Sequence, residues 1–151
     1  MSREEASARV RPQRHFFALW PDAPAARALE ALGDCLAARC GGKAVPAAKI
    51  HLTLAFLGDI GAERVEEAAA AGASIETVPF DVAFDTIGWF RGAKVAWAGC
   101  ANPAPGLLAL HRRLDEALRR RRFVLESRPY TPHLTLVRKA SRPVPDRKSV
   151  V

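Results

Sequence analysis

The tetrapeptide His-Leu-Thr-Leu occurs twice in this chain, at residues 51–54 and again at residues 133–136. Because successive side chains of a β-strand point to opposite faces, the histidine and threonine of each copy share one face and the two leucines share the other. We therefore predict that each copy is a strand with a buried apolar face. Its polar face carries an imidazole and a hydroxyl about 6.6 Å apart. Two such strands facing each other would surround a small anion with two proton carriers and two hydroxyl donors.

The sequence around the repeats supports a functional role for their polar side chains. The chain has four histidines, and two of them, His51 and His133, occupy equivalent places in the repeats. Each repeat is entered by a proline-containing run, and Pro132 biases the residue before it toward the extended conformation of a strand. Thr53 and Thr135 are good strand formers, and their place beside the imidazoles makes them candidate hydroxyl donors to phosphate oxygens. These four side chains predict a site for chemistry at phosphorus.

The rest of the chain alternates between strand patterns and helix patterns. Besides the second repeat, the predicted strands span residues 14–20, 50–57, 80–87, 94–98 and 123–125, with a turn at residues 89–92. The predicted helices run from Asp22 or Ala23 to about Arg39, over about residues 62–71, and from Asn102-Pro103 through Leu118, with Gly41-Gly42 ending the first. This order, with its internal repeat, predicts an α+β fold of two lobes with antiparallel sheets, related by a pseudo-two-fold axis.

The length of the chain, 151 residues, is that of one ordinary domain with a real core. Residues 1–13 are polar, arginine-rich and aperiodic, and we expect them to be a flexible tail. Residues 14–138 form the predicted domain. Residues 139–151 form a short C-terminal tail in which two prolines interrupt any long strand.

The net charge of +7 is unevenly distributed along the chain. Residues 15–111 are net −3, whereas residues 112–122 are net +4 and residues 128–151 are net +5. The basic segments surround the second repeat, as expected if a polyanion such as nucleic acid approaches there. The chain also has 18 arginines against 5 lysines, a bias that GC-rich coding produces by itself. The charge pattern alone therefore leaves nucleic-acid binding open.

Composition and the cysteine pattern indicate a cytoplasmic protein. No apolar run approaches the roughly 20 residues that span a bilayer, so we expect no membrane association. The first residues lack the apolar core of a signal peptide. The three cysteines are odd in number and form no Cys-x-x-Cys pair, which fits reduced thiols.

Neither repeat has the spacing of a metal site. Metal-binding histidines are usually supported by a second histidine or a carboxylate at short spacing, whereas here the residue two positions on is threonine and no acidic residue lies inside either motif. We therefore expect no catalytic metal and no cofactor. Of the other histidines, His15 is expected to pack or lie at the surface, and His111 is expected on a solvated helix face.

Three further side chains are candidates for binding. Arg138 follows His133 by five residues, an odd spacing that places it on the opposite face of a regular strand. If the chain turns at the strand end, Arg138 could still reach a phosphate, so we include it as a binding residue. Phe90 and Tyr130 could each stack a base or could pack in the core or a loop.

These motifs resemble those of the 2H phosphoesterase superfamily, and especially its RNA 2′,3′-cyclic phosphodiesterases, also called 2′-5′ RNA ligase-like proteins. The matching segments occur in the family's order within residues 14–138. They are Arg14-His15-Phe16-Phe17-Ala18-Leu19, the run from His51 to Gly58, Val95-Ala96-Trp97-Ala98-Gly99, and the run from Arg128 to Arg138. One His-x-Thr is a weak signal, whereas the paired motifs with these flanks are specific.

The resemblance implies a bilobal α+β fold with both motifs facing a central cleft. It also implies metal-independent hydrolysis of a terminal 2′,3′-cyclic phosphate to a 2′-phosphomonoester, in RNA ends or small cyclic nucleotides. By family analogy His51 is the general acid and His133 the general base, while Thr53 and Thr135 hold the non-bridging oxygens. The near symmetry of the motifs leaves the assignment of acid and base open from the residues alone. Since an imidazole titrates near ~6.5, one histidine can be charged and the other neutral at neutral pH.

Two alternatives remain at this level. The reverse reaction would join a cyclic phosphate end to a 5′-hydroxyl in a 2′-5′ bond, and a non-catalytic RNA-binding module would use the same cleft and arginines. The resemblance also implies further elements after the second motif, which this chain does not contain. We therefore predict an exposed sheet edge beside that motif, in a monomer or closed by a second molecule in a dimer.

Overall fold

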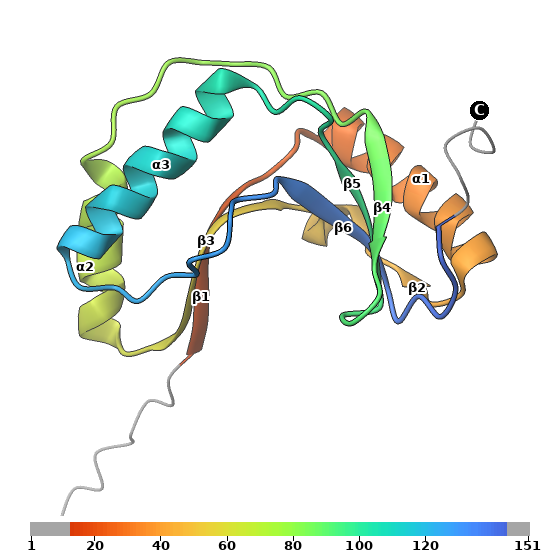
Figure 1. Ribbon diagram of the computed structural model, residues 1–151, viewed down its shortest axis with the longest axis horizontal. Helices are drawn as coiled ribbons and strands as arrows, with labels where there is room; N and C mark the ends of the chain where they lie inside the picture. Colours follow the sequence, from red (N-terminus) through yellow and green to blue (C-terminus); the bar gives the residue numbers. More distant parts are fainter. Residues whose placement is uncertain (1–12, 145–151) are drawn as a thin grey trace, which may run out of the picture.

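A computed structural model describes residues 13–144 and shows an α+β protein whose strand pairings are all antiparallel (Figure 1). The strands are β1 (Gln13–Leu19), β2 (Lys43–Ala44), β3 (Leu52–Ile60), β4 (Thr86–Phe90), β5 (Val95–Gly99) and β6 (His133–Arg138). The helices are α1 (Ala23–Cys40), α2 (Ala62–Ala73), α3 (Pro105–Arg120) and the short 3₁₀ helix η1 (Ala47–Lys49). The predicted fold class is thus confirmed. None of the helices in this range is long and apolar enough to cross a membrane.

The strands form one sheet with a narrow centre. Its order is β1-β3-β6-β5-β4, and β2 pairs with β6 beyond the end of β3. The two motif strands β3 and β6 lie next to each other but are joined by a single residue pair, Leu52 with Leu134. The two separate sheets that we predicted are therefore wings of one sheet that meet at this pair. The pseudo-two-fold axis stays a prediction.

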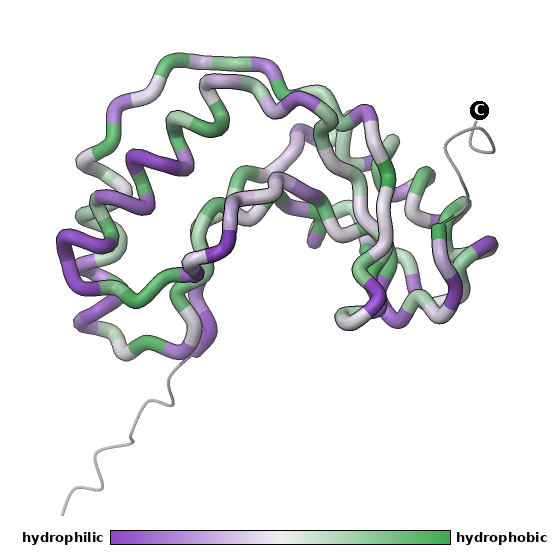
Figure 2. The backbone as a smooth tube through the Cα atoms, in the orientation of Figure 1, coloured by the Kyte–Doolittle hydropathy of each residue, from purple (hydrophilic) through white to green (hydrophobic). Residues whose placement is uncertain are grey.

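The first and last helices each pack against the part of the sheet formed by the other end of the chain. Helix α1, from the N-terminal part of the chain, packs against β2 and β6, whereas α3, from the C-terminal part, packs with α2 and contacts β3 (Figure 1). Figure 2 shows α3 as alternating hydrophobic and hydrophilic bands, as expected of a helix with one apolar face. Its buried leucines join those of the motif strands in one core, which includes Leu36, Leu107, Leu118, Leu134 and Leu136.

The predicted boundaries of the first helix are confirmed. A side-chain oxygen of Asp22 accepts a hydrogen bond from the backbone N–H of Ala25 at 2.9 Å, which caps the N-terminus of α1. Gly41 follows the last residue with a φ of 71°, a conformation that glycine adopts without strain. The third helix begins at Pro105 rather than at Asn102-Pro103. Proline disfavours the helical conformation in the residue before it, so Pro105 excludes an earlier start.

Two predicted strands are wrong. Of the predicted strand at residues 80–87, residues 80–85 are not a strand: the first strand of the hairpin, β4, begins at Thr86 and pairs with β5 across a turn at residues 91–94. The alternating apolar residues Phe80, Val82 and Phe84 instead pack against the core from an extended segment, with Phe80 close to Gly106 of α3. Residues 123–125 are likewise irregular, and Phe123 is buried beneath the Arg64 guanidinium at 3.9 Å.

The expected open edge beside the second motif is also wrong. Strand β6 has β5 on one side and β3, then β2, on the other, so it is not an edge strand. Within the described sheet the strands paired on one side only are β1, β4 and the two-residue β2. The predicted tail at residues 1–13 lies outside the described residues except for Gln13, which belongs to β1. Of the predicted C-terminal tail, residues 139–144 are described and the remainder is not. The oligomeric state stays a prediction.

Candidate active site

Both motif histidines open into one cavity of about 360 Å³ at the centre of the sheet. The side chains of all five predicted site residues line it, and they come from β6 and from β3 with the residue that precedes it: His51, Thr53, His133, Thr135 and Arg138. The structure therefore brings together the residues that the sequence singles out. Their chemical roles stay predictions.

The two imidazoles are held in the same way. His51 Nδ1 lies 2.8 Å from the carbonyl oxygen of Lys49, and His133 Nδ1 lies 2.8 Å from that of Thr131. A carbonyl oxygen can only accept a hydrogen bond, so each Nδ1 carries the proton and each Nε2 is left for chemistry. His15 makes the same contact with the carbonyl of Gln13 but lines neither of the cavities described in this section. Hence the hydrogen bond is a feature of the extended backbone, and the shared cavity distinguishes the two motif histidines.

Each imidazole is also flanked by two aromatic rings. The His51 ring stacks on Phe16 at 4.8 Å between centroids and meets Trp20 at 4.9 Å. The His133 ring makes T-shaped contacts with Phe90, at 5.1 Å between centroids, and with Trp97, at 6.2 Å. Sequence reasoning named Phe90 as a candidate to stack a base, not as a neighbour of His133. It missed the other three rings because they come from other strands and from a loop. The rings restrict imidazole rotation, so the two Nε2 atoms keep fixed directions.

A β-bulge explains how Arg138 reaches the cavity. Trp97 of β5 pairs with Thr135, and its neighbour Ala96 pairs with Val137, so Leu136 is an extra residue on β6. Leu136 and Val137 are both buried, and Arg138 returns to the face of His133 and Thr135. The odd spacing, which would place Arg138 on the opposite face of a regular strand, is thus the spacing that a bulged strand requires.

The first motif contains a matching bulge. Phe17 and Ala18 of β1 pair with Ala55 and Thr53, which leaves Leu54 without a partner. Phe56 then lines the cavity three residues after Thr53, as Arg138 does three residues after Thr135. Each motif therefore supplies a histidine, a threonine and a third side chain to one face.

The cavity is electropositive and suited to a phosphate. Arg14, Lys49 and Arg138 line it, and no acidic residue does so among residues 13–144. Sequence reasoning missed Arg14 and Lys49, although Lys49 precedes His51 by two residues and so had the right strand spacing. Within the same range, no group of three or more His, Cys, Asp or Glu side chains is arranged to hold a metal ion.

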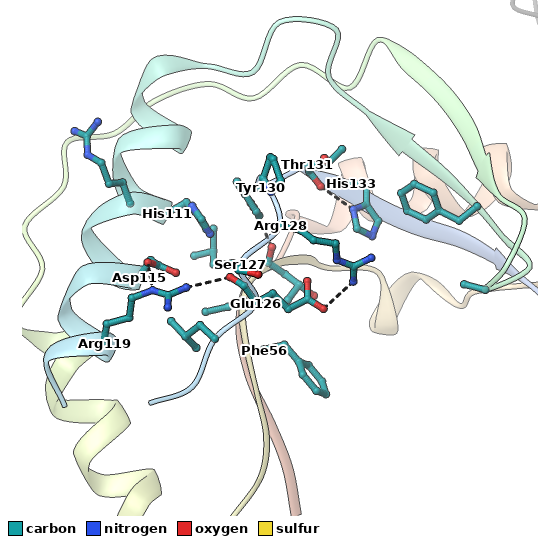
Figure 3. Close-up of a pocket in the computed structure, with 18 of the residues that line it drawn as sticks. Phe56, His111, Asp115, Arg119, Glu126, Ser127, Arg128, Tyr130, Thr131 and His133 are labelled. Atoms are coloured by element: carbon teal, nitrogen blue, oxygen red, sulfur yellow. Dashed lines mark hydrogen bonds and ion pairs between the residues drawn. The ribbon is translucent and has the colours of Figure 1, made fainter. Parts of the chain in front are cut away.

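A larger cavity of about 780 Å³ adjoins the first and shares Thr53, Phe56 and His133 with it (Figure 3). Its wall includes His111 and Tyr130, whose rings are parallel within 2° at 3.8 Å. The predicted solvated position of His111 is therefore wrong: the ring is half-buried, and this burial lowers its pKa against an opposing effect of Asp115. Burial raises the pKa of Tyr130, whose hydroxyl donates to the Thr53 carbonyl at 2.9 Å.

Comparison with known proteins gives a consistent set of relatives. The model of the 2′-5′ RNA ligase superfamily matches residues 20–149. The RNA 2′,3′-cyclic phosphodiesterase of Escherichia coli (strain K12) is 35% identical over 103 residues, or 68% of this chain and 58% of that protein. The RNA 2′,3′-cyclic phosphodiesterase of Methanocaldococcus jannaschii is 33% identical over 101 residues, or 65% of this chain and 56% of that protein. The chain thus spans less than two thirds of these relatives.

Solved structures resemble the chain over most of its length. A crystal structure of a phosphoesterase has a TM-score of 0.80 and 31% identity, over 89% of this chain and 80% of that one. Escherichia coli LigT complexed with 3′-AMP has a TM-score of 0.73 and 31% identity, over the same shares of 89% and 80%.

Proposed function

The chain is a member of the 2′-5′ RNA ligase superfamily, and we propose that it hydrolyses the 2′,3′-cyclic phosphate at an RNA end, or in a small cyclic nucleotide, to a 2′-phosphomonoester. One observation carries the proposal: two imidazoles with Nδ1 engaged by backbone carbonyls line a single cavity with three cations. The curated relatives named RNA 2′,3′-cyclic phosphodiesterase support the same reaction.

The reaction needs one base and one acid on opposite sides of the phosphorus. His133 Nε2 takes a proton from water while the water oxygen forms a bond to phosphorus. The bond from phosphorus to the 3′ oxygen breaks, and protonated His51 supplies a proton to that oxygen. Each positioned acid or base contributes about 10²–10⁴ in rate. The assignment of acid and base follows the family resemblance.

The remaining side chains of the small cavity stabilise charge on the phosphate. The hydroxyls of Thr53 and Thr135 donate to the non-bridging oxygens, and neither is engaged by another residue in the described part of the chain. Arg138, with Arg14 and Lys49, balances the negative charge that increases as water adds. We propose that the reaction needs no metal ion, because the two imidazoles supply both proton transfers.

The test is turnover of a cyclic mononucleotide and of a short oligoribonucleotide with a 2′,3′-cyclic phosphate end, in EDTA. We expect a 2′-phosphate product from the wild type and a loss of about 10²-fold or more in kcat for His51→Ala and for His133→Ala. His15→Ala is the matched control, because His15 makes the same backbone contact outside the cavities. Full activity of either motif variant would refute the mechanism. Binding of RNA by the wild type without turnover would indicate a binding module.

The acid and base can be separated with an aryl phosphodiester, whose phenolate leaves without needing a proton. If His51 is the acid, His51→Ala recovers much of its activity on this substrate while His133→Ala does not. The reverse result would exchange the two roles.

A further inference from the structure

The larger cavity adjoins the small one and shares part of its wall. The two cavities meet at Thr53, Phe56 and His133, so a substrate whose cyclic phosphate lies between the histidines can extend into the larger cavity. At about 780 Å³ against 360 Å³, the second cavity has the size of a complete ligand site. Nothing in the hydrolysis of the phosphate itself uses this space.

The wall of the larger cavity contains an aromatic platform that is fixed to the catalytic strand. The rings of His111, from α3, and Tyr130, from the loop before β6, are stacked at 3.8 Å. The Tyr130 hydroxyl donates to the carbonyl of Thr53, whose side chain lines the small cavity. Phe56, half of whose side chain is exposed, lies at the junction. Nucleobases stack on such rings whatever their sequence, because every base has an aromatic face.

Three arginines, Arg112, Arg119 and Arg128, line the same cavity, and Figure 3 shows Arg119 and Arg128 on its wall. Arg119 is held by Asp115 at 2.7 Å and by the Glu126 carbonyl at 3.0 Å. Arg128 pairs with the Glu126 carboxylate at 2.9 Å, but the side chains are 81% and 68% exposed, so this ion pair stabilises little and can be exchanged for a phosphate. Arg112 is exposed and makes no ion pair among residues 13–144.

We propose that the larger cavity binds the nucleotide on the 5′ side of the cyclic-phosphate end, with its base on the His111–Tyr130 stack and its phosphodiester at Arg112 and Arg128. The inference rests on the proposed function and adds to it a second subsite, for the nucleotide next to the reacting end. An acidic peptide would match the arginines but would leave the stacked rings unused. The combination of stacking surface and cations therefore favours single-stranded RNA.

The test compares kcat/KM for a cyclic mononucleotide with kcat/KM for a trinucleotide ending in a 2′,3′-cyclic phosphate. We expect the trinucleotide to be the better substrate by about tenfold or more, as one stacked base and one charged contact contribute. Arg112→Ala and His111→Ala should each lower kcat/KM by about tenfold for the trinucleotide, mainly through KM, and leave the mononucleotide value within about twofold. Arg120→Ala removes an arginine from the same helix outside the cavity and should change neither value.

The outcomes separate this inference from the proposed function. Equal kcat/KM for both substrates, or equal losses on both in Arg112→Ala, would overturn the subsite while leaving the hydrolase in place. If the wild type turns over neither substrate, the hydrolase proposal fails. Fluorescence anisotropy with a labelled trinucleotide 2′-phosphate then decides the subsite by itself. Weaker binding in Arg112→Ala than in Arg120→Ala supports it, and equal binding overturns it.

Discussion

Replacing Gly88 by alanine tests whether the β4–β5 hairpin positions His133, the proposed general base. Gly88 of β4 pairs with Trp97 of β5, and a Cβ atom at position 88 would overlap the Trp97 indole ring. That ring contacts Phe90 at 5.0 Å and His133 at 6.2 Å, and Phe90 contacts His133 at 5.1 Å. A displaced indole must therefore move the rings that hold the imidazole.

The expected loss of stability in Gly88→Ala follows from the cost of overpacking. Inserting a methyl group into a filled space costs about 1–3 kcal/mol, which for a chain of this size lowers Tm by roughly 3–10 °C. We expect kcat on a cyclic mononucleotide to fall as well, by about tenfold, because proton transfer depends on the placement of His133 Nε2. Calorimetry and initial rates measure the two effects. Gly92→Ala is the matched control, because a Cβ there meets no atom within 4 Å.

A second substitution tests whether the effect of Gly88→Ala comes from the contact with Trp97. Trp97→Phe makes room for the added methyl, and the Trp97 Nε1 that it removes is buried without a hydrogen-bond partner in the described structure. The loss in Gly88→Ala should therefore be smaller in a Trp97→Phe background than alone. If Gly88→Ala is as stable and active as Gly92→Ala, the proposed support of His133 by Trp97 is wrong. The same conclusion follows if the two substitutions are additive.

Three other predictions concern single side chains. Arg138→Ala should lower kcat/KM about 10- to 100-fold through loss of a charged contact to the phosphate, while Lys139→Ala, next in the chain but outside both cavities, should stay near the wild type. Tyr130→Phe should lower the free energy of unfolding by about 1–3 kcal/mol in urea titrations, because the Thr53 carbonyl loses its donor. Because burial lowers the pKa of His111, the unfolded chain binds more protons there, so stability should fall as pH drops below about 6.5. This fall should be smaller in His111→Gln, and an identical pH dependence would contradict the assignment.

Two patterns that combine independent sequence signals agree with the structure. The first helix combines a capping aspartate, an early proline and a terminal glycine, and its bounds match the prediction. The two repeats combine strand alternation with equivalent histidines, and both histidines open into one cavity. The predicted strand at residues 80–87 rests on the alternation of apolar and polar residues alone. That pattern also arises when an unpaired segment packs one side against a core.

The parts of the site that the sequence left open depend on tertiary register. The bulge at Leu136 has no distinctive sequence signal, because two consecutive buried aliphatic residues also occur in regular buried strands. It appears only when β6 is aligned with β5, and the face of Arg138 depends on it. The stacking of His111 on Tyr130 joins a helix and a loop that single-sequence periodicity treats separately.

Because helix α1 packs against strand β6 from the other end of the chain, it can be buried only late in synthesis. Helix α1 is complete at Cys40, yet the carbonyl of Cys40 accepts hydrogen bonds from the backbone N–H groups of Ser141 and Arg142. Strand β6, the longer of the two strands that α1 packs against, begins at His133. A nascent chain on the ribosome therefore holds an amphipathic helix with its apolar stripe uncovered until nearly the whole described chain has emerged. Closing loops of this length slows folding. The first helix to be made is thus the last to be buried, and a chaperone that shields it should raise the yield of native protein.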